Sequence, residues 1–137
     1  MLDPRPFKSH GLLLRMHDWL TDPVPDDLSP APLLSEYAIA IDQMGLPLLV
    51  GWVSGHPRLG DRWITTSPLW QIDAKGTQAR TSGRCYRLSS EMRKSNQVKA
   101  NPRIAALQQQ SLSLNSTKAH LCNIRSIVER ELAKRSH

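Results

Sequence analysis

Arginine is the residue type whose positions in this sequence most clearly predict chemistry. Several arginines lie in or beside short alternating apolar segments between positions 51 and 88, a pattern typical of β-strands and turns. Guanidinium groups on an exposed sheet can bind phosphates or carboxylates, because each offers several donors in a fixed plane. We expect a binding surface formed by Arg58, Arg62, Arg80, Arg84, Arg87, Tyr86, Arg125 and Arg130.

No residue pattern of the chain predicts catalysis. His56 lies in a loop that contains glycine and proline, but spacing ties no nucleophile or carboxylate to it. A histidine that hydrogen-bonds its own loop is the simpler interpretation, and a hydrolase or nuclease using His56 is a distant alternative. Cys85 and Cys122 lack metal-ligand spacing and are expected to be small buried thiols, with a disulfide between them as the alternative. We therefore expect no catalytic residue, no metal site and no cofactor.

The formal net charge of +6 over 137 residues is unevenly distributed. Residues 1–50 contain three basic and seven acidic residues, whereas residues 51–137 contain fifteen basic and five acidic ones. A basic half favours a nucleic acid or an acidic protein surface as partner, although a solvated positive face explains the same composition. No apolar run approaches the roughly 20 residues that span a bilayer, and no secretory signal is evident, so we expect a cytoplasmic protein without membrane contact.

Apolar spacing predicts the elements that must position these arginines. Residues 9–20 and 30–44 each show a helical stripe, and the second lies between a Ser29–Pro30 start signal and Gly45. From residue 46 the period changes to two, and Pro68 is expected to break, bulge or edge the sheet. The expected strands are 46–53, which is apolar on both faces, 62–66, 69–73 as a new strand or a continuation, 77–81 and 84–88.

The C-terminal part of the chain is expected to be basic and helical. Asn101–Pro102 begins one helix and Ser116 another, while residues 90–101 predict a short helix or a link. The fold class is therefore α+β, with two N-terminal helices, a three- to five-stranded antiparallel meander sheet and C-terminal helices. Residues 1–89 are interpreted as the core domain and residues 90–137 as a helical extension. The apolar stripe of the last helix is Leu121, Ile124, Val128 and Leu132.

Three motifs occur in the segment that contains most of the arginines. They are Gly-His-Pro-Arg-Leu at 55–59, Thr-Ser-Pro-Leu-Trp-Gln-Ile-Asp at 66–73, and Ala-Arg-Thr-Ser-Gly-Arg-Cys-Tyr-Arg-Leu at 79–88. They resemble a family of small uncharacterised alphaproteobacterial proteins, often encoded on mobile elements. One serine lies a position earlier than in the family pattern. The resemblance covers residues 33–89 and implies a shared fold and a mobile-element origin, but no activity.

Two classes of function fit these observations. We expect a small non-enzymatic binding or regulatory protein that engages a nucleic acid or a nucleoprotein complex. The alternative is a protein-binding inhibitor or adaptor, for example one that acts against a host defence system or a CRISPR effector. The two differ in whether the arginines meet phosphates or carboxylates.

Overall fold

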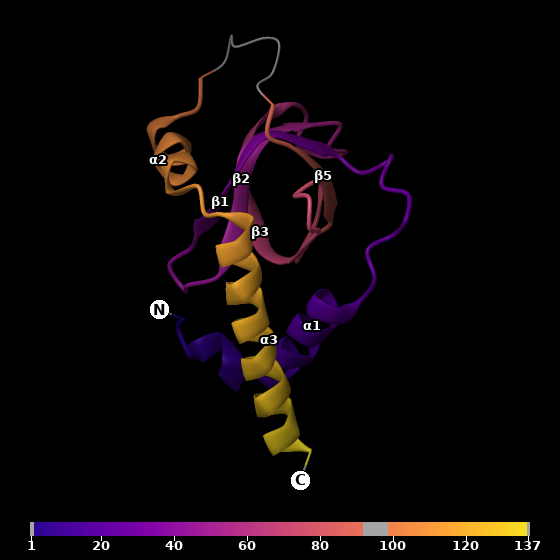
Figure 1. Cartoon of the computed structure of the whole chain (residues 1–137), viewed down its shortest axis with the longest axis vertical. Helices are drawn as coiled ribbons and strands as arrows, with labels where there is room; N and C mark the ends of the chain where they lie inside the picture. The colour runs from indigo at the N-terminus through magenta and orange to yellow at the C-terminus, as the bar shows by residue number, and fades with distance from the viewer. Residues whose placement is uncertain (1, 92–98, 137) are drawn as a thin grey trace.

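The structure, a computed structural model, describes residues 2–91 and 99–136 and consists of a five-stranded β-barrel with helices packed outside it (Figure 1). The predicted α+β class, with helices on both sides of a meander in sequence, is confirmed. The strands are β1 (Leu33–Ile41), β2 (Pro47–Ser54), β3 (Arg62–Ile72), β4 (Gln78–Thr81) and β5 (Cys85–Ser89). The helices are the 3-10 helix η1 (Arg5–Lys8) and the α-helices α1 (His10–Thr21), α2 (Pro102–Gln110) and α3 (Leu114–Arg135).

The barrel closes because the strands pair in sequence order and the last strand returns to the first. β1 pairs with β2, β2 with β3, β3 with β4 and β4 with β5, and each of these pairs is antiparallel. An odd number of strands in such a meander leaves the first and the last pointing the same way. β5 therefore pairs with β1 in parallel, and closure removes the exposed edges that an open sheet would present.

Bulges bend β3 around this small barrel. A register shift against β2 inserts one extra residue into β3 close to Pro68, which has no N–H to contribute to a ladder. The hydroxyl of Thr66 accepts a hydrogen bond from the N–H of Leu49 at 3.0 Å and so satisfies a donor at the bulge. A second shift lies between Leu69 and Gln71, against β4. The segments expected on either side of Pro68 are therefore one bent strand, and the bulge predicted there is confirmed.

The helix expected at residues 30–44 is wrong, because most of this segment forms β1. The register of β1 with β2 shifts around Glu36, whose φ of 50° lies in the left-handed region. This bulge interrupts the period of two, so that Leu34 and Ile39, which share the barrel interior, are five positions apart. The apolar residues of β1 therefore lack the period of two from which a strand is recognised. Gly45 lies in the β1–β2 turn with a φ of 83° instead of ending a helix.

Hydrophobic residues form one cluster inside the barrel and two outside it. α1 and α3 pack together on one outer cluster, in which Leu13 and Ile124 lie with Trp70 of β3. α2 covers β1 and β2 through Ile104, which packs with Ala40 and Val50. β2 is thus buried on both faces, as its sequence predicts. The inner cluster consists of Leu34, Ile39, Leu49, Val53, Ile64, Leu69, Ala79, Tyr86 and Leu88.

Side-chain caps begin both C-terminal helices. The Oδ1 of Asn101 accepts the N–H of Ile104 at 2.9 Å, which confirms the predicted start of α2. α3 begins earlier than expected, because Ser113 is its N-cap and accepts the N–H of Ser116 at 3.0 Å. Most of the short helix or link expected at 90–101 lies outside the described residues. Three members of the predicted α3 stripe are buried, namely Leu121, Ile124 and Val128.

A pair of glycine substitutions tests how tightly the barrel is packed. A Cβ on Gly51 would lie 2.8 Å from the carbonyl oxygen of Ser35, so Gly51→Ala should lower the free energy of unfolding. We expect a loss of about 1–3 kcal/mol in urea denaturation, because the backbone must shift. Gly11→Ala in α1 is the matched control: nothing lies within 4 Å of its Cβ, and it should add about 0.5–1 kcal/mol. Equal stability of the two variants would contradict the close approach of β1 and β2.

Candidate nucleic-acid interface

His56 organises the loop between β2 and β3. Its Nδ1 accepts hydrogen bonds from the N–H groups of Arg58 at 3.1 Å and Leu59 at 3.2 Å. At the base of the loop, the N–H of Gly55 donates to Asp61 Oδ1 at 3.3 Å. Because Nδ1 is an acceptor, the ring proton of the neutral imidazole belongs on Nε2. The expectation of a histidine that hydrogen-bonds its own loop is confirmed, and the position of Arg58 depends on this ring.

Electrostatic contacts link this loop to the β4–β5 turn. Partial burial, followed by the positive charges of Arg84 and Arg58, lowers the pKa of His56. Arg84 is distant from His56 in sequence, so the barrel is what brings these two side chains within electrostatic reach. Both Arg58 and Arg84 therefore lie close enough to the His56 ring to affect its charge.

Hydrogen bonds to the bulged part of β3 fix the position of Arg84. The carbonyl oxygen of Arg84 accepts the N–H of Thr81 at 2.9 Å, which closes the tight turn. The N–H of Gly83 donates to the hydroxyl of Ser67 at 3.1 Å, and the N–H of Ser82 donates to the carbonyl of Pro68 at 3.0 Å. The Ser82-Gly83 turn and the Ser67-Pro68 segment of β3 are therefore bound to each other by hydrogen bonds.

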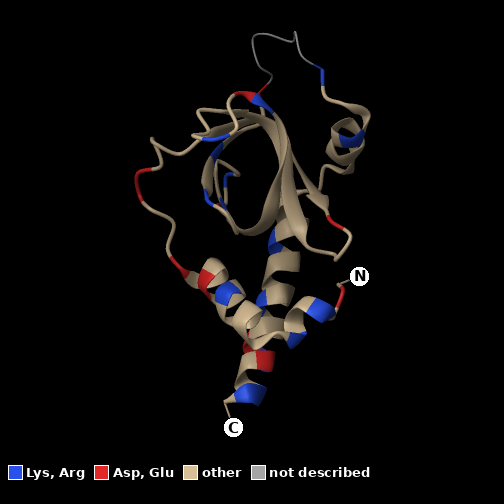
Figure 2. Cartoon of the chain, turned by 180° about the vertical axis from the view of Figure 1, so that it is seen from behind, with Lys and Arg blue, Asp and Glu red and all other residues tan. Residues whose placement is uncertain are grey.

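The connector, defined as residues 22–32 between α1 and β1, passes along the same side of the barrel. The carbonyl of Ala31 accepts Arg87 Nε at 2.9 Å, and the carbonyl of Pro32 accepts the Arg87 N–H at 2.9 Å. Leu28 is buried and anchors the middle of the connector. A groove of about 370 Å³ separates the connector from the barrel, with Arg84 in its wall. Figure 2 shows the blue segments of the barrel on the side from which the connector runs to α1.

Arg80 lies on the outer face of β4, between Gln71 on β3 and Cys85 on β5. Its Nε is buried and has no hydrogen-bond partner. A donor removed from water without an acceptor costs free energy, and such groups are uncommon enough in folded proteins to indicate a specific role. Arg62 is exposed at the first position of β3, next to the His56 loop.

These five arginines share one electrostatic property, and together they are called the arginine face. Within residues 2–91 and 99–136, none of them forms an ion pair with a carboxylate. No carboxylate of the described residues is therefore bound directly to these guanidinium groups. The members of the arginine face are Arg58, Arg62, Arg80, Arg84 and Arg87.

The structure does not bring the remaining predicted site residues to this face. Tyr86 is 5% exposed and lies inside the barrel, where burial raises the pKa of its hydroxyl, so its ring is no surface for base stacking. Arg125 pairs with Glu129 at 2.9 Å on α3. Arg130 is exposed on the same helix, in the part that extends away from the barrel (Figure 1).

The connector is a participant that the sequence did not predict. Its prolines and its acidic residues Asp22, Asp26 and Asp27 predict a stiff acidic segment, but composition cannot say what such a segment lies against. Asp27 Oδ1 accepts the N–H of Ser29 at 2.9 Å, and hydrogen bonds from Ser29 lower the pKa of this carboxyl. Negative charge thus remains beside the arginine face over the neutral pH range.

A family comparison covers most of this structure. The profile of a family of unknown function, DUF6634, matches residues 14–128. The chain belongs to DUF6634. This match confirms membership of an uncharacterised family, and it extends beyond the segment 33–89 on both sides. No curated protein and no solved structure matches this DUF6634 protein.

Two further findings concern the described residues of this DUF6634 protein. None of their helices is long and apolar enough to cross a bilayer. The same residues contain no group of three or more histidine, cysteine, aspartate or glutamate side chains placed to hold a metal ion. The expectation of buried thiols is wrong, because Cys122 is exposed and Cys85 is only partly buried.

The titration of His56 tests whether Arg84 lies beside it. NMR should find the pKa of His56 below that of an unperturbed histidine, and Arg84→Ala should raise it by removing a nearby positive charge. Arg130→Ala is the control that should leave this titration unchanged. Because folding lowers this pKa, His56 should reduce the stability of the DUF6634 protein as the pH falls through the range of an unfolded histidine. The same His56 pKa in wild type and Arg84→Ala would contradict the placement of Arg84 beside His56.

Proposed function

We propose that this protein binds nucleic acid through the arginine face and acts as a non-enzymatic binding or regulatory protein. The observation that carries the proposal is that Arg58 and Arg84 both lie close enough to His56 to lower its pKa, while no member of the arginine face forms an ion pair with a carboxylate of the described residues. Phosphate groups supply the missing negative charge, and their oxygens accept the planar, paired donors of guanidinium groups.

The arrangement favours contact with the phosphate backbone over reading of bases. Tyr86, the aromatic residue expected at this surface, is buried in the barrel. Sequence-independent binding needs only positive charge that follows the backbone, whereas base recognition needs stacking surfaces or donors aimed at base edges. We therefore propose that the protein recognises nucleic acid by its charge and not by its base sequence, and that it does so in the cytoplasm. An origin on a mobile element, which the resemblance of the sequence implies, belongs to the same proposal.

Salt dependence and arginine substitution test this proposal. Fluorescence anisotropy with a labelled oligonucleotide should show affinity falling steeply with salt, with a log–log slope of about −2 to −3 if three arginines contact phosphates. Arg58→Ala combined with Arg84→Ala should weaken binding about tenfold or more and reduce the slope by roughly 1–2.

Arg130→Ala is the matched control, because Arg130 is an exposed arginine on α3, outside the arginine face. It should bind the oligonucleotide as the wild type does. Absence of binding at low salt, or an equal loss in the control and the double variant, would overturn the proposal. Binding to an acidic protein without any binding to the oligonucleotide would assign the face to a protein partner.

The acidic connector should weaken binding at the neighbouring face. Asp26→Asn combined with Asp27→Asn removes two negative charges while keeping the side-chain oxygen that caps the N–H of Ser29. We expect oligonucleotide affinity to rise about two- to fivefold at low salt, since each surface charge contributes a few tenths of a kcal/mol, and the gain should shrink as salt increases. Unchanged affinity at low salt would place the bound ligand away from the connector.

A further inference from the structure

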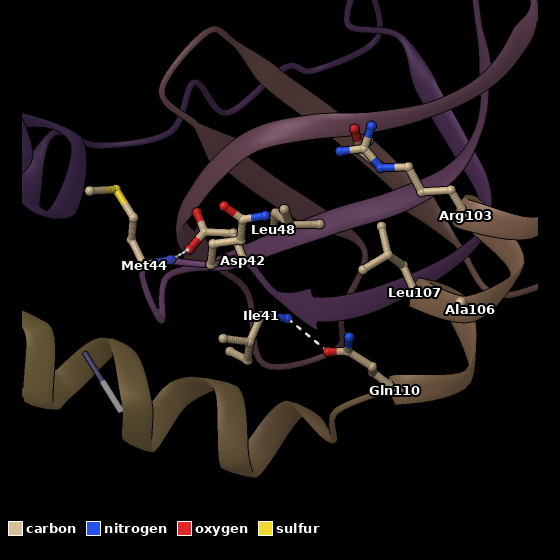
Figure 3. A pocket seen from close by; sticks show the side chains of 10 residues that line it. Ile41, Asp42, Met44, Leu48, Arg103, Ala106, Leu107 and Gln110 are labelled. Carbon is tan, nitrogen blue, oxygen red and sulfur yellow. Dashed lines mark hydrogen bonds between the residues drawn. The ribbon is translucent and has the colours of Figure 1, made fainter. Parts of the chain in front are cut away.

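A pocket of about 600 Å³ lies between α2 and the barrel, on a side of the fold that the arginine face does not use. Its walls come from β1, the β1–β2 turn, β2, β3 and α2. α2 is held above the sheet by the buried Ile104 and by Gln110, whose Oε1 accepts the N–H of Ile41 at 3.1 Å (Figure 3). The space beside these two contacts is left open, and its volume is in the range of small-molecule sites.

The middle of the pocket is aliphatic. Leu48 from β2 and Leu107 from α2 face it from opposite sides, with Ile41 below and Ala106 beside Leu107 on α2, and no aromatic ring lines it. Leu48, Leu107 and Ile41 are only partly buried in the protein as it stands. A ligand with a flexible hydrocarbon body would cover these side chains and remove apolar surface from water, which favours binding.

The polar groups of the pocket lie at its two ends. Arg103 reaches over one end from the first turn of α2, and Asp42 lies at the other end (Figure 3). Asp42 Oδ1 already accepts the N–H groups of Met44 at 2.8 Å and Leu46 at 2.9 Å, so this carboxylate serves the turn. Arg103 forms no ion pair with any described residue.

We propose that this pocket binds a small amphiphilic anion, specifically an aliphatic carboxylate whose headgroup pairs with Arg103 and whose chain lies against Leu48 and Leu107. The guanidinium of Arg103 offers paired donors that match a carboxylate. The charge of Asp42 repels the headgroup from the opposite end and so sets the direction of the ligand.

Decanoate is the probe that tests this site, with decanol as the uncharged probe of equal chain length. In the full-length protein with labelled Leu and Ile methyl groups, decanoate should shift the NMR signals of Ile41, Leu48 and Leu107 in a saturable manner. Decanol should bind the same site about tenfold more weakly, because it has no charged group to pair with Arg103.

Three variants separate the contributions of charge and shape. Arg103→Met keeps a long apolar stem and should weaken decanoate about tenfold or more, while decanol affinity changes by less than about twofold. Ala106→Trp fills the pocket from an exposed position and should abolish the binding of both probes. Arg15→Met, which changes an exposed arginine on α1, is the matched control and should bind decanoate as the wild type does.

Several results would overturn the assignment. They are the absence of saturable shifts at the pocket methyl groups, equal affinity of Arg103→Met and wild type for decanoate, or shifts confined to the methyl groups beside Trp19 and Trp70. The site stands apart from the arginine face. The double variant Arg58→Ala and Arg84→Ala should therefore retain decanoate binding, whatever its effect on nucleic acid.

Discussion

The parallel pairing of β1 with β5 is the constraint on which the rest of the structure depends. Five strands in a simple meander can close only in this way, and closure at so small a radius requires bent strands. The bulges around Glu36 and near Pro68 supply the bends. They also aim side chains, since the bulged part of β3 holds the β4–β5 turn that carries Arg84.

Closure also explains why the helices lie where they do. A barrel buries one side of each strand inside, so any apolar residue on the outer side needs a separate cover. Val50 and Ala40 are covered by α2, and Trp70 is covered by α1 and α3, with its ring stacked on Trp19 at 5.5 Å between centroids. The outer surface that no helix covers is the side of the connector, and this is where the arginine face lies.

Local signals in the sequence predicted part of this fold well. Turn residues and the period of two located the strands after residue 46, apolar spacing located α1, and a cap residue located α2, because these signals depend on near neighbours. β1 was missed since its bulge changes the apolar period, and a bulge is set by the strand it pairs with rather than by its own residues. The pairing of β1 with β5 could not be predicted for the same reason, because it joins segments that are distant in the sequence.

The candidate site follows the same division. Arg58, Arg80, Arg84 and Arg87 were predicted from their place in strands and turns, and the alternation along β5 correctly put Arg87 on the face opposite Tyr86. The exposure of Tyr86 could not be predicted, because two faces of a strand differ only in what packs on each. The connector matters because it passes along the barrel and contacts β5, and the composition of a segment does not predict which distant strand it will contact.

The shared cluster of α1 and α3 has a consequence for how the protein is made. Leu13 and Ile124 contact the same core, yet α1 is synthesised before the barrel and α3 after it. The barrel strands can pair as soon as β5 has emerged, whereas the part of α1 that packs on α3 stays exposed until α3 has been translated. The period of greatest risk of aggregation on the ribosome is therefore the interval between the completion of β5 and the arrival of α3.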